Sequence, residues 1–302
     1  MDFVVLPARL EFVAQDSLRL PPGKELNIFR GALGAALRRI SCVPRCTWED
    51  NRTHSRECVY ARFFEPRWEE GPSGYRDAPR PFVLRWASGH GDVAPGEAFA
   101  ADIFVFDTLE SPWSALEEAF TLAGASGFGQ TKGRAKLINF EPARSGGLRL
   151  PVVGAPGYGS LRLSFVTPTE LKSAGEVLIE PAFPVTIHRL AERVRALGRL
   201  YQGWPDEWNY TDLLAAAQDV KLTRWEWVRT DVFRRSASNG QQHSIGGFTG
   251  WAEYTGPIGA FLPLLEIGRW VGVGRQTVWG KGEIRIERVE LQPSNTSCVA
   301  IP

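Results

Sequence analysis

Apolar and polar residues alternate in some segments of the chain and recur at helical spacing in others. Phe3–Val13 alternates as a half-buried strand does, and Leu26–Ile40 carries an apolar residue every three or four positions, as an amphipathic helix does. Further along the first half, the pattern predicts strands at Pro81–Trp86, Glu97–Phe106 and Ala135–Phe140, and a helix at Pro112–Leu122 that Ser111 would cap. The first half therefore follows the order strand, helix, strand, strand, helix, strand.

The second half repeats this order. Its expected strands are Ser160–Val166, Leu222–Phe233, Gly247–Tyr254 and Glu283–Leu291, and its expected helices are Val185–Tyr201, Ile258–Trp270 and an additional one near Tyr210–Gln218. Two such units predict an α+β protein with two tandem ferredoxin-like (RRM-like, βαββαβ) domains, each an antiparallel sheet backed by helices. We expect these domains at residues 1–142 and 159–302, with a glycine-rich linker over 141–159 and a polar insertion at 41–80.

A glycine-rich loop precedes the last strand of each half, at Gly124–Gly133 and Gly272–Gly282. Because the two loops occupy equivalent places, we expect them on one side of the molecule. The second loop could offer backbone N–H groups to phosphate, with Arg275 and Lys281 alongside. A tight connection that needs positive φ angles accounts for the glycines equally well. A strand follows the loop instead of a helix, which excludes a dinucleotide-binding fingerprint.

Composition narrows the class of protein. The 302 residues carry a net charge of +1, so no strong overall field favours nonspecific binding to nucleic acid or membrane. A hydrophobic fraction of 43% is too high for a disordered chain. The sequence has no apolar run near the ~20 residues of a membrane span and no signal-peptide pattern. We therefore expect a cytoplasmic protein with no membrane partner.

Several segments together resemble one family. Gly246–Gly256, Phe261–Gly268 and Val273–Gly282 resemble the C-terminal signature of the CRISPR-associated RAMP endoribonucleases, and more narrowly of the type that processes precursor crRNA. Upstream segments agree with this resemblance, namely Phe29–Gly34, Leu37–Arg39, Cys58–Tyr60, Phe64–Pro66, Leu163–Pro168 and Arg234–Ser236. The resemblance spans nearly the whole chain and implies two tandem ferredoxin-like domains, as the periodicity does.

The resemblance implies binding and cleavage of CRISPR repeat RNA without a catalytic cofactor. The ribose 2′-OH attacks the adjacent phosphate and leaves a 2′,3′-cyclic phosphate and a 5′-OH. Relatives often carry a histidine for proton transfer in or near the first helix, whereas Leu26–Ile40 contains none. We therefore assign proton transfer to His243, in a polar loop, and stabilisation of phosphoryl charge to Arg30 and Arg38 in that helix.

Expected RNA contacts gather in the second half of the chain. They are Arg234, Arg235, Gly272, Gly274, Arg275, Gly280, Lys281 and Gly282. Since contacts to phosphate release counterions, the affinity for RNA should fall steeply with salt concentration.

The insertion contains a candidate metal site. Cys42, Cys46, His54 and Cys58 could supply three thiolates and one imidazole to a structural zinc ion. The spacing is irregular and contains no C-x2-C pair, so small buried hydrophobic side chains are the competing interpretation.

Two other functions compete with RNA cleavage. The first is a non-catalytic crRNA-binding RAMP subunit that works with other Cas subunits in an effector complex, which the lack of a first-helix histidine favours. The second is a structural module that binds a protein partner through the cysteine loop and a tryptophan-rich surface. Incubation with the repeat RNA in EDTA separates cleavage from binding.

Overall fold

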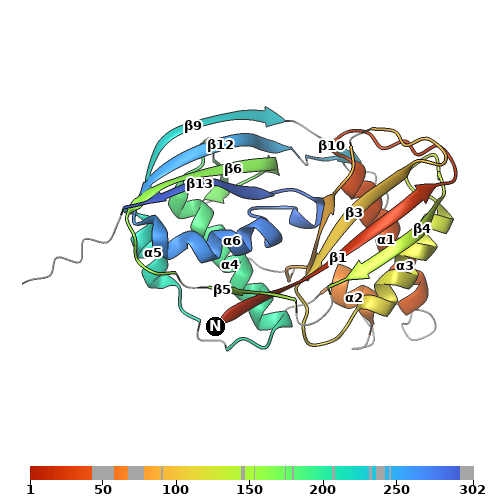
Figure 1. The fold of residues 1–302 in the computed structure, drawn as a ribbon, viewed down its shortest axis with the longest axis horizontal. Helices are drawn as coiled ribbons and strands as arrows, with labels where there is room; N and C mark the ends of the chain where they lie inside the picture. The colour runs from red at the N-terminus through yellow and green to blue at the C-terminus, as the bar shows by residue number, and fades with distance from the viewer. Residues whose placement is uncertain are drawn as a thin grey trace, which may run out of the picture.

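The computed structural model describes residues 1–42, 58–66, 78–89, 91–143, 147–152, 154–173, 175–178, 180–205, 208–230 and 246–292, and the backbone of 233–235 and 242–244. None of the described helices is both long and apolar enough to cross a membrane. Two lobes lie side by side in Figure 1, with α1 and β3 in one and α4 and β12 in the other.

The first lobe is a ferredoxin-like domain. Its elements are β1 (Asp2–Ala14), α1 (Glu25–Ser41), α2 (Val59–Phe64), β2 (Phe82–Trp86), β3 (Ala98–Val105), α3 (Trp113–Ser126) and β4 (Ala135–Pro142). The strands pair in the order β2-β3-β1-β4, and every pairing is antiparallel. Phe12 of β1 and Phe29 of α1 are fully buried, with ring centroids 5.7 Å apart. Apolar residues of α1 and α3 complete this core.

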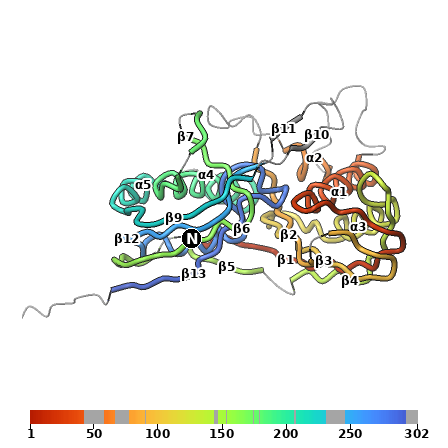
Figure 2. The backbone as a smooth tube through the Cα atoms, turned by 90° about the horizontal axis from the view of Figure 1, so that it is seen from above, coloured from red at the N-terminus to blue at the C-terminus, as the bar shows by residue number. Residues whose placement is uncertain are grey.

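The second lobe has the same topology. Its main elements are β6 (Gly159–Thr169), α4 (Phe183–Tyr201), α5 (Thr211–Ala217), β9 (Lys221–Thr230), β12 (Gly247–Gly256), a 3₁₀ turn η1 (Ile258–Phe261), α6 (Leu262–Val271), a 3₁₀ turn η2 (Thr277–Trp279) and β13 (Ile284–Leu291). The strand order is β13-β6-β12-β9, again antiparallel. The predicted tandem fold is therefore confirmed. Figure 2 shows α1 and α4 on the same side of the molecule, with strands of both sheets beneath them.

Several short elements were not predicted. They are α2 within the expected polar insertion, β5 (Leu148–Pro151) within the expected linker, and the hairpins β7 (Lys172–Ser173) with β8 (Glu176–Val177) and β10 (Phe233–Arg235) with β11 (Gln242–Ser244). Segments this short do not complete a recognisable period. One detail is corrected: Ser111 does not cap α3, because Pro112 is the N-cap and no side chain caps that helix.

The two domains share their cores along β1. The strand starts beside the second domain and runs into the first (Figure 1). Its early residues Phe3 and Val5 are fully buried in one cluster with residues of α4 and α6. Gln202, which follows α4, donates hydrogen bonds from Nε2 to the carbonyls of Val4 at 2.8 Å and Phe106 at 2.9 Å. β5 pairs with this early part of β1. The predicted linker is therefore partly a strand of the first sheet.

Candidate functional site

One face of α1 carries both arginines predicted to act in catalysis. Arg30, Gly34 and Arg38 are four residues apart, which places them on the same side of the helix. Gly34 lets α2 pack closely there, since a Cβ atom would lie 2.7 Å from a ring carbon of Phe64. A larger residue at position 34 would push the two helices apart.

The aromatic residues of α2 lie between the two arginines. The rings of Tyr60 and Phe64 stack with centroids 5.6 Å apart and an interplanar angle of 4°. The guanidinium of Arg30 lies 5.0 Å from the Phe64 ring centroid, and that of Arg38 lies 5.8 Å from the Tyr60 centroid. Both distances are within the range of cation–π attraction. The structure thus brings Arg30, Arg38 and Tyr60 onto one surface, which we call the α1–α2 face.

Tyr60 was not predicted as a site residue. Its hydroxyl donates a hydrogen bond to Oε1 of Glu65 at 2.8 Å. Burial, with a smaller contribution from this hydrogen bond, raises the pKa of Tyr60 to about 12. The phenol therefore stays protonated at neutral pH and serves as a donor, not as a base. The signal in the sequence was Cys58–Tyr60, which contributes to the family resemblance.

The second domain reaches the α1–α2 face through its glycine loop. The Trp279 ring of η2 lies 5.5 Å from the guanidinium of Arg30, and Val278 is buried in the core of the first domain. Gly280 packs against Leu26 at the start of α1, where a Cβ atom would overlap the leucine side chain. The loop therefore fixes the position of α1 relative to the second domain.

The backbone of this loop bonds mostly to itself and to its neighbours. The amide of Val273 donates to the carbonyl of Gly282, that of Gly280 to Thr277, and that of Gly282 to Pro168. The loop glycines Gly272, Gly274, Gly280 and Gly282 all have φ between 71° and 80°, in the left-handed region that glycine tolerates best. The amides of Gly272, Gly280 and Gly282 donate to carbonyl groups of the protein itself. The RNA contacts predicted at these glycines stay predictions.

Lys281 and Arg275 have different surroundings. Lys281 is only 4% exposed, and its pKa is lowered by burial and raised to a smaller extent by Glu25, which is 3% exposed. This ammonium is buried at the contact between the domains, and the RNA contact predicted for Lys281 stays a prediction. Arg275 is 57% exposed and forms an ion pair with Glu170 at 2.9 Å. It remains accessible to an RNA phosphate.

Both glycine-rich loops lie at the N-terminal end of α1, as expected from their equivalent positions. A Cβ at Gly129 in the first loop would lie 3.8 Å from Ile28, and Gly280 in the second loop contacts Leu26. Phe128 of the first loop is buried and stacks on Phe29 with centroids 4.4 Å apart. The prediction that the loops share one side of the molecule is confirmed.

His243 is described only through its backbone. In the β10–β11 hairpin it lies opposite Arg234, and Arg235 lies opposite Gln242. The side chains of these residues lie outside the described part of the structure, so their assigned roles stay predictions.

Of the other histidines, His54 and His90 also lie outside the described residues. His188 lies on α4, where its Nε2 is 3.4 Å from a carboxylate oxygen of Glu192 four residues later. A surface role therefore accounts for His188.

Two of the four predicted metal ligands lie together. Cys42 follows α1 and Cys58 precedes α2; both are buried, and their Sγ atoms are 3.5 Å apart. Two thiolates bound at ~2.3 Å to a tetrahedral zinc ion would be roughly 3.8 Å apart, so this pair fits one edge of such a site. Cys46 and His54 lie outside the described residues, and the described residues alone form no group of three metal ligands.

Two segments of the chain match models of known protein families. Residues 3–158 match the model of the AF_1859_N N-terminal domain, and residues 163–284 match that of the CRISPR-associated endoribonuclease Cas6. The chain belongs to the AF_1859_N family and carries a Cas6 domain. The Cas6 match includes α4, β12 and most of the glycine loop. A comparison with the sequences of curated proteins gives no match.

Solved structures show the same fold. A product complex of Cas6 (TTHB231) has a TM-score of 0.58 at 18% identity, over 95% of this chain and 100% of that chain. The structure of Thermus thermophilus Cas6 (TTHB231) has a TM-score of 0.53 at 16% identity, over 94% of this chain and 98% of that chain. A product complex of Cas6 (TTHA0078) has a TM-score of 0.51 at 18% identity, over 94% of this chain and 100% of that chain. The chain therefore has the tandem ferredoxin-like fold of Cas6 along nearly its full length.

Proposed function

We propose that this protein is an endoribonuclease that binds CRISPR repeat RNA and processes precursor crRNA. The observation that carries the proposal is the match of residues 163–284 to the Cas6 endoribonuclease model. Two of the similar structures are described as product complexes, which is consistent with such an activity. The α1–α2 face adds two guanidinium groups and a protonated phenol on one surface.

In the proposed reaction, the 2′-OH beside the scissile phosphate attacks phosphorus in line. The products are a 2′,3′-cyclic phosphate and a 5′-OH, and no metal ion takes part. Arg38 and Arg30 offset the charge that develops on the phosphoryl oxygens. Arginine side chains donate hydrogen bonds and are poor bases, so their role is charge stabilisation and not proton transfer.

Proton transfer is assigned to His243. Histidine suits this task because the free imidazole exchanges its proton at ~pH 6.5, close to neutral. The single proton of the Tyr60 hydroxyl is donated to Glu65, so the role of Tyr60 is to position Arg38, whose guanidinium lies over its ring. Arg234 and Arg235, in the same hairpin as His243, would hold the RNA backbone together with Arg275.

The test is incubation of the purified protein with its repeat RNA in EDTA. We expect cleavage to a product that ends in a 2′,3′-cyclic phosphate. The matched control is the same RNA with a 2′-deoxy nucleotide at the cleavage site, which should bind equally well and remain intact. Tight binding with the all-ribose RNA left intact would reject the nuclease and favour a crRNA-binding subunit.

A further inference from the structure

The helix α2 forms half of the α1–α2 face, yet its six residues are too few for a helix that is stable on its own. Contacts with the rest of the protein therefore decide where its side chains lie. Its rings Tyr60 and Phe64 contact the guanidinium groups of Arg38 and Arg30. Arg62 lies two residues after Tyr60, and so on the opposite side of the helix.

Arg62 binds two carboxylates of the first domain. Its Nη2 donates a hydrogen bond to Oδ1 of Asp107 at 2.6 Å, and its Nε forms an ion pair with the other oxygen of the same carboxylate. Its Nη1 forms an ion pair with Glu110. Asp107 is 1% exposed, and burial raises its pKa while the Arg62 guanidinium opposes that rise. Because the planar guanidinium offers two donors to one carboxylate, this contact holds α2 in one orientation relative to Asp107.

The segment around Asp107, which follows β3, is held by the second domain. The amide of Thr108 donates a hydrogen bond to the carbonyl of Tyr201, at the end of α4, at 2.9 Å. Nε2 of Gln202 donates to the carbonyl of Phe106, also at 2.9 Å, and the Phe106 ring is buried in the core of the second domain. Asp107 therefore has a fixed position relative to α4.

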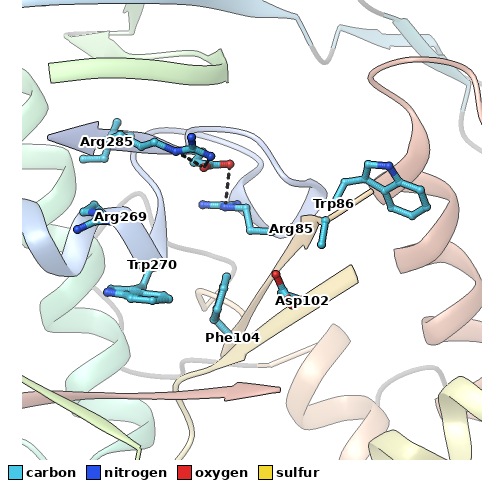
Figure 3. Close-up of a pocket in the computed structure, with 10 residues that line it drawn as sticks. Arg85, Trp86, Asp102, Phe104, Arg269, Trp270 and Arg285 are labelled. Carbon is cyan, nitrogen blue, oxygen red and sulfur yellow. Dashed lines mark hydrogen bonds and ion pairs between the residues drawn. The ribbon is translucent and has the colours of Figure 1, made fainter. Parts of the chain in front are cut away.

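The strands that lead to this segment also contact the second domain. Phe104 of β3 meets Trp270 of α6 edge to face, with ring centroids 5.0 Å apart. On the neighbouring strand β2, Nε of the buried Arg85 lies 3.3 Å from a carboxylate oxygen of Glu283. Figure 3 shows Phe104 beside Trp270, with Arg85 above them. The second domain thus holds the end of β3 from both its side chains and its backbone.

We propose that Arg62 is a positioning residue for RNA cleavage, which holds α2 against α1 from a segment that the second domain fixes. The position of the arginines on the α1–α2 face then depends on the contact between the domains, through Asp107, Arg62 and the rings of Tyr60 and Phe64. Arg62 acts through these rings and not on the RNA itself. The inference rests on the proposed function, because it assigns the reaction to the α1–α2 face.

Cleavage of repeat RNA by the full-length Arg62→Lys variant tests the proposal. This variant keeps a positive charge beside Asp107 but loses the planar fork. The single-turnover rate should fall by roughly 10-fold to 100-fold, since small misplacements of reacting groups cost rate, while the affinity for uncleavable 2′-deoxy RNA stays close to that of the wild type. Arg134→Lys is the matched control, because Arg134 forms the same two-donor contact with Asp16 but is 59% exposed. Equal cleavage rates in the two variants would overturn the proposal.

Two double variants separate positioning from a loss of stability. Arg62→Gln with Asp107→Asn removes both charges at once and should also slow cleavage, so the test does not depend on a buried carboxylate without its partner. In an Arg38→Ala background, Arg62→Lys should slow cleavage by a smaller factor than in the wild type, because one of the groups that it positions is gone. The same factor in both backgrounds would mean that Arg62 acts independently of the α1–α2 face, which would overturn the proposal.

Hydrogen exchange reports on α2 without any cleavage. The amides of Arg62 and Glu65 donate to the carbonyls of Cys58 and Ala61 and should exchange faster in Arg62→Lys than in Arg134→Lys. Equal exchange would overturn the anchoring of α2. A wild type that leaves repeat RNA intact would overturn the proposed function and with it the role in cleavage. A wild type that cleaves no faster than Arg62→Lys would overturn the positioning role alone.

Discussion

Gly280 of the C-terminal glycine loop packs directly on Leu26 of α1, in a backbone conformation with φ of 77°. The contact joins residues from different domains and holds the loop at the first turn of the helix that carries Arg30 and Arg38. The close approach and the positive φ both favour glycine, and each has a measurable consequence.

Gly280→Ala should destabilise the protein by more than the backbone strain alone. A non-glycine residue at this φ costs of order 1–3 kcal/mol, and overlap with Leu26 adds to that. Gly175→Ala is the matched control, because φ there is 87° but a Cβ would meet open space. Urea denaturation should give a larger loss of unfolding free energy at position 280. Equal losses of unfolding free energy in the two variants would mean that the Leu26 side chain can move aside without destabilising the protein.

Glu25 and Lys281 should be energetically coupled across the domain contact. Both are buried, and opposite charges interact more strongly in a low dielectric than in water. The double-mutant cycle of Glu25→Gln and Lys281→Met should give a coupling of ~0.5–3 kcal/mol. The exposed Arg275–Glu170 pair is the control and should give at most ~1 kcal/mol. A coupling no larger than that of the control would show that the two buried charges act independently.

The same lysine predicts how stability changes with alkaline pH. Because burial lowers the pKa of Lys281 below its ordinary 10.5, the unfolded chain binds more protons between the two values. Stability contributed by this group therefore rises with pH through that window and falls as pH decreases toward the folded-state pKa. Urea denaturation at several alkaline pH values should show this contribution in the wild type and not in Lys281→Met. If the unfolding free energy changed with pH equally in the wild type and in Lys281→Met, this role of Lys281 would be refuted.

His243→Ala should slow single-turnover cleavage by ~10²–10⁴-fold and leave the affinity for RNA nearly unchanged. His188→Ala is the matched control, because His188 is a surface residue next to Glu192. This variant should cleave RNA at the wild-type rate. A rate for His243→Ala within a few-fold of the wild type would remove the role of this histidine. A large loss in Arg38→Ala alone would then locate catalysis on the α1–α2 face.

The cysteine pair predicts a structural metal. Protein purified without chelator should contain one zinc ion per chain, held by Cys42, Cys46, His54 and Cys58. Cys58→Ser should lose the metal and unfold at a lower temperature, yet still cleave RNA. Cys298→Ser is the control and should keep the zinc. Elemental analysis that finds no metal in the wild type would leave the two buried cysteines as packing residues.

Much of the fold could be predicted because its elements are long and periodic. The expected strand Phe3–Val13 is observed as Asp2–Ala14, and the expected helix Leu26–Ile40 as Glu25–Ser41. The short helix α2 escaped prediction because six residues form too few turns to show a helical period. It is held by the stacking of Tyr60 on Phe64 and by the contacts of Phe63 and Phe64 with Phe82.

The candidate site was predicted only in part. Placing Arg30 and Arg38 on the first helix needs helical spacing alone, which the sequence shows. The sequence could not show that the glycine loop packs against the first helix. Its contacts with Glu25 and Leu26 join residues about 250 positions apart, and no local pattern reveals such contacts. The sequence gives no sign that Arg85 of β2 is buried, because its ion pair is with Glu283 of the second domain.

The shared strand β1 makes the two halves mutually dependent during folding. Phe3, Val5, Val83 and Phe106 belong to the first half of the chain, yet they are buried in the core of the second. A fragment that begins at residue 159 would expose the surface these side chains cover, and such a surface favours aggregation. During synthesis, the start of β1 emerges from the ribosome long before α4 and α6 exist to bury it. The protein should therefore unfold in a single cooperative transition, as one unit despite its two sheets.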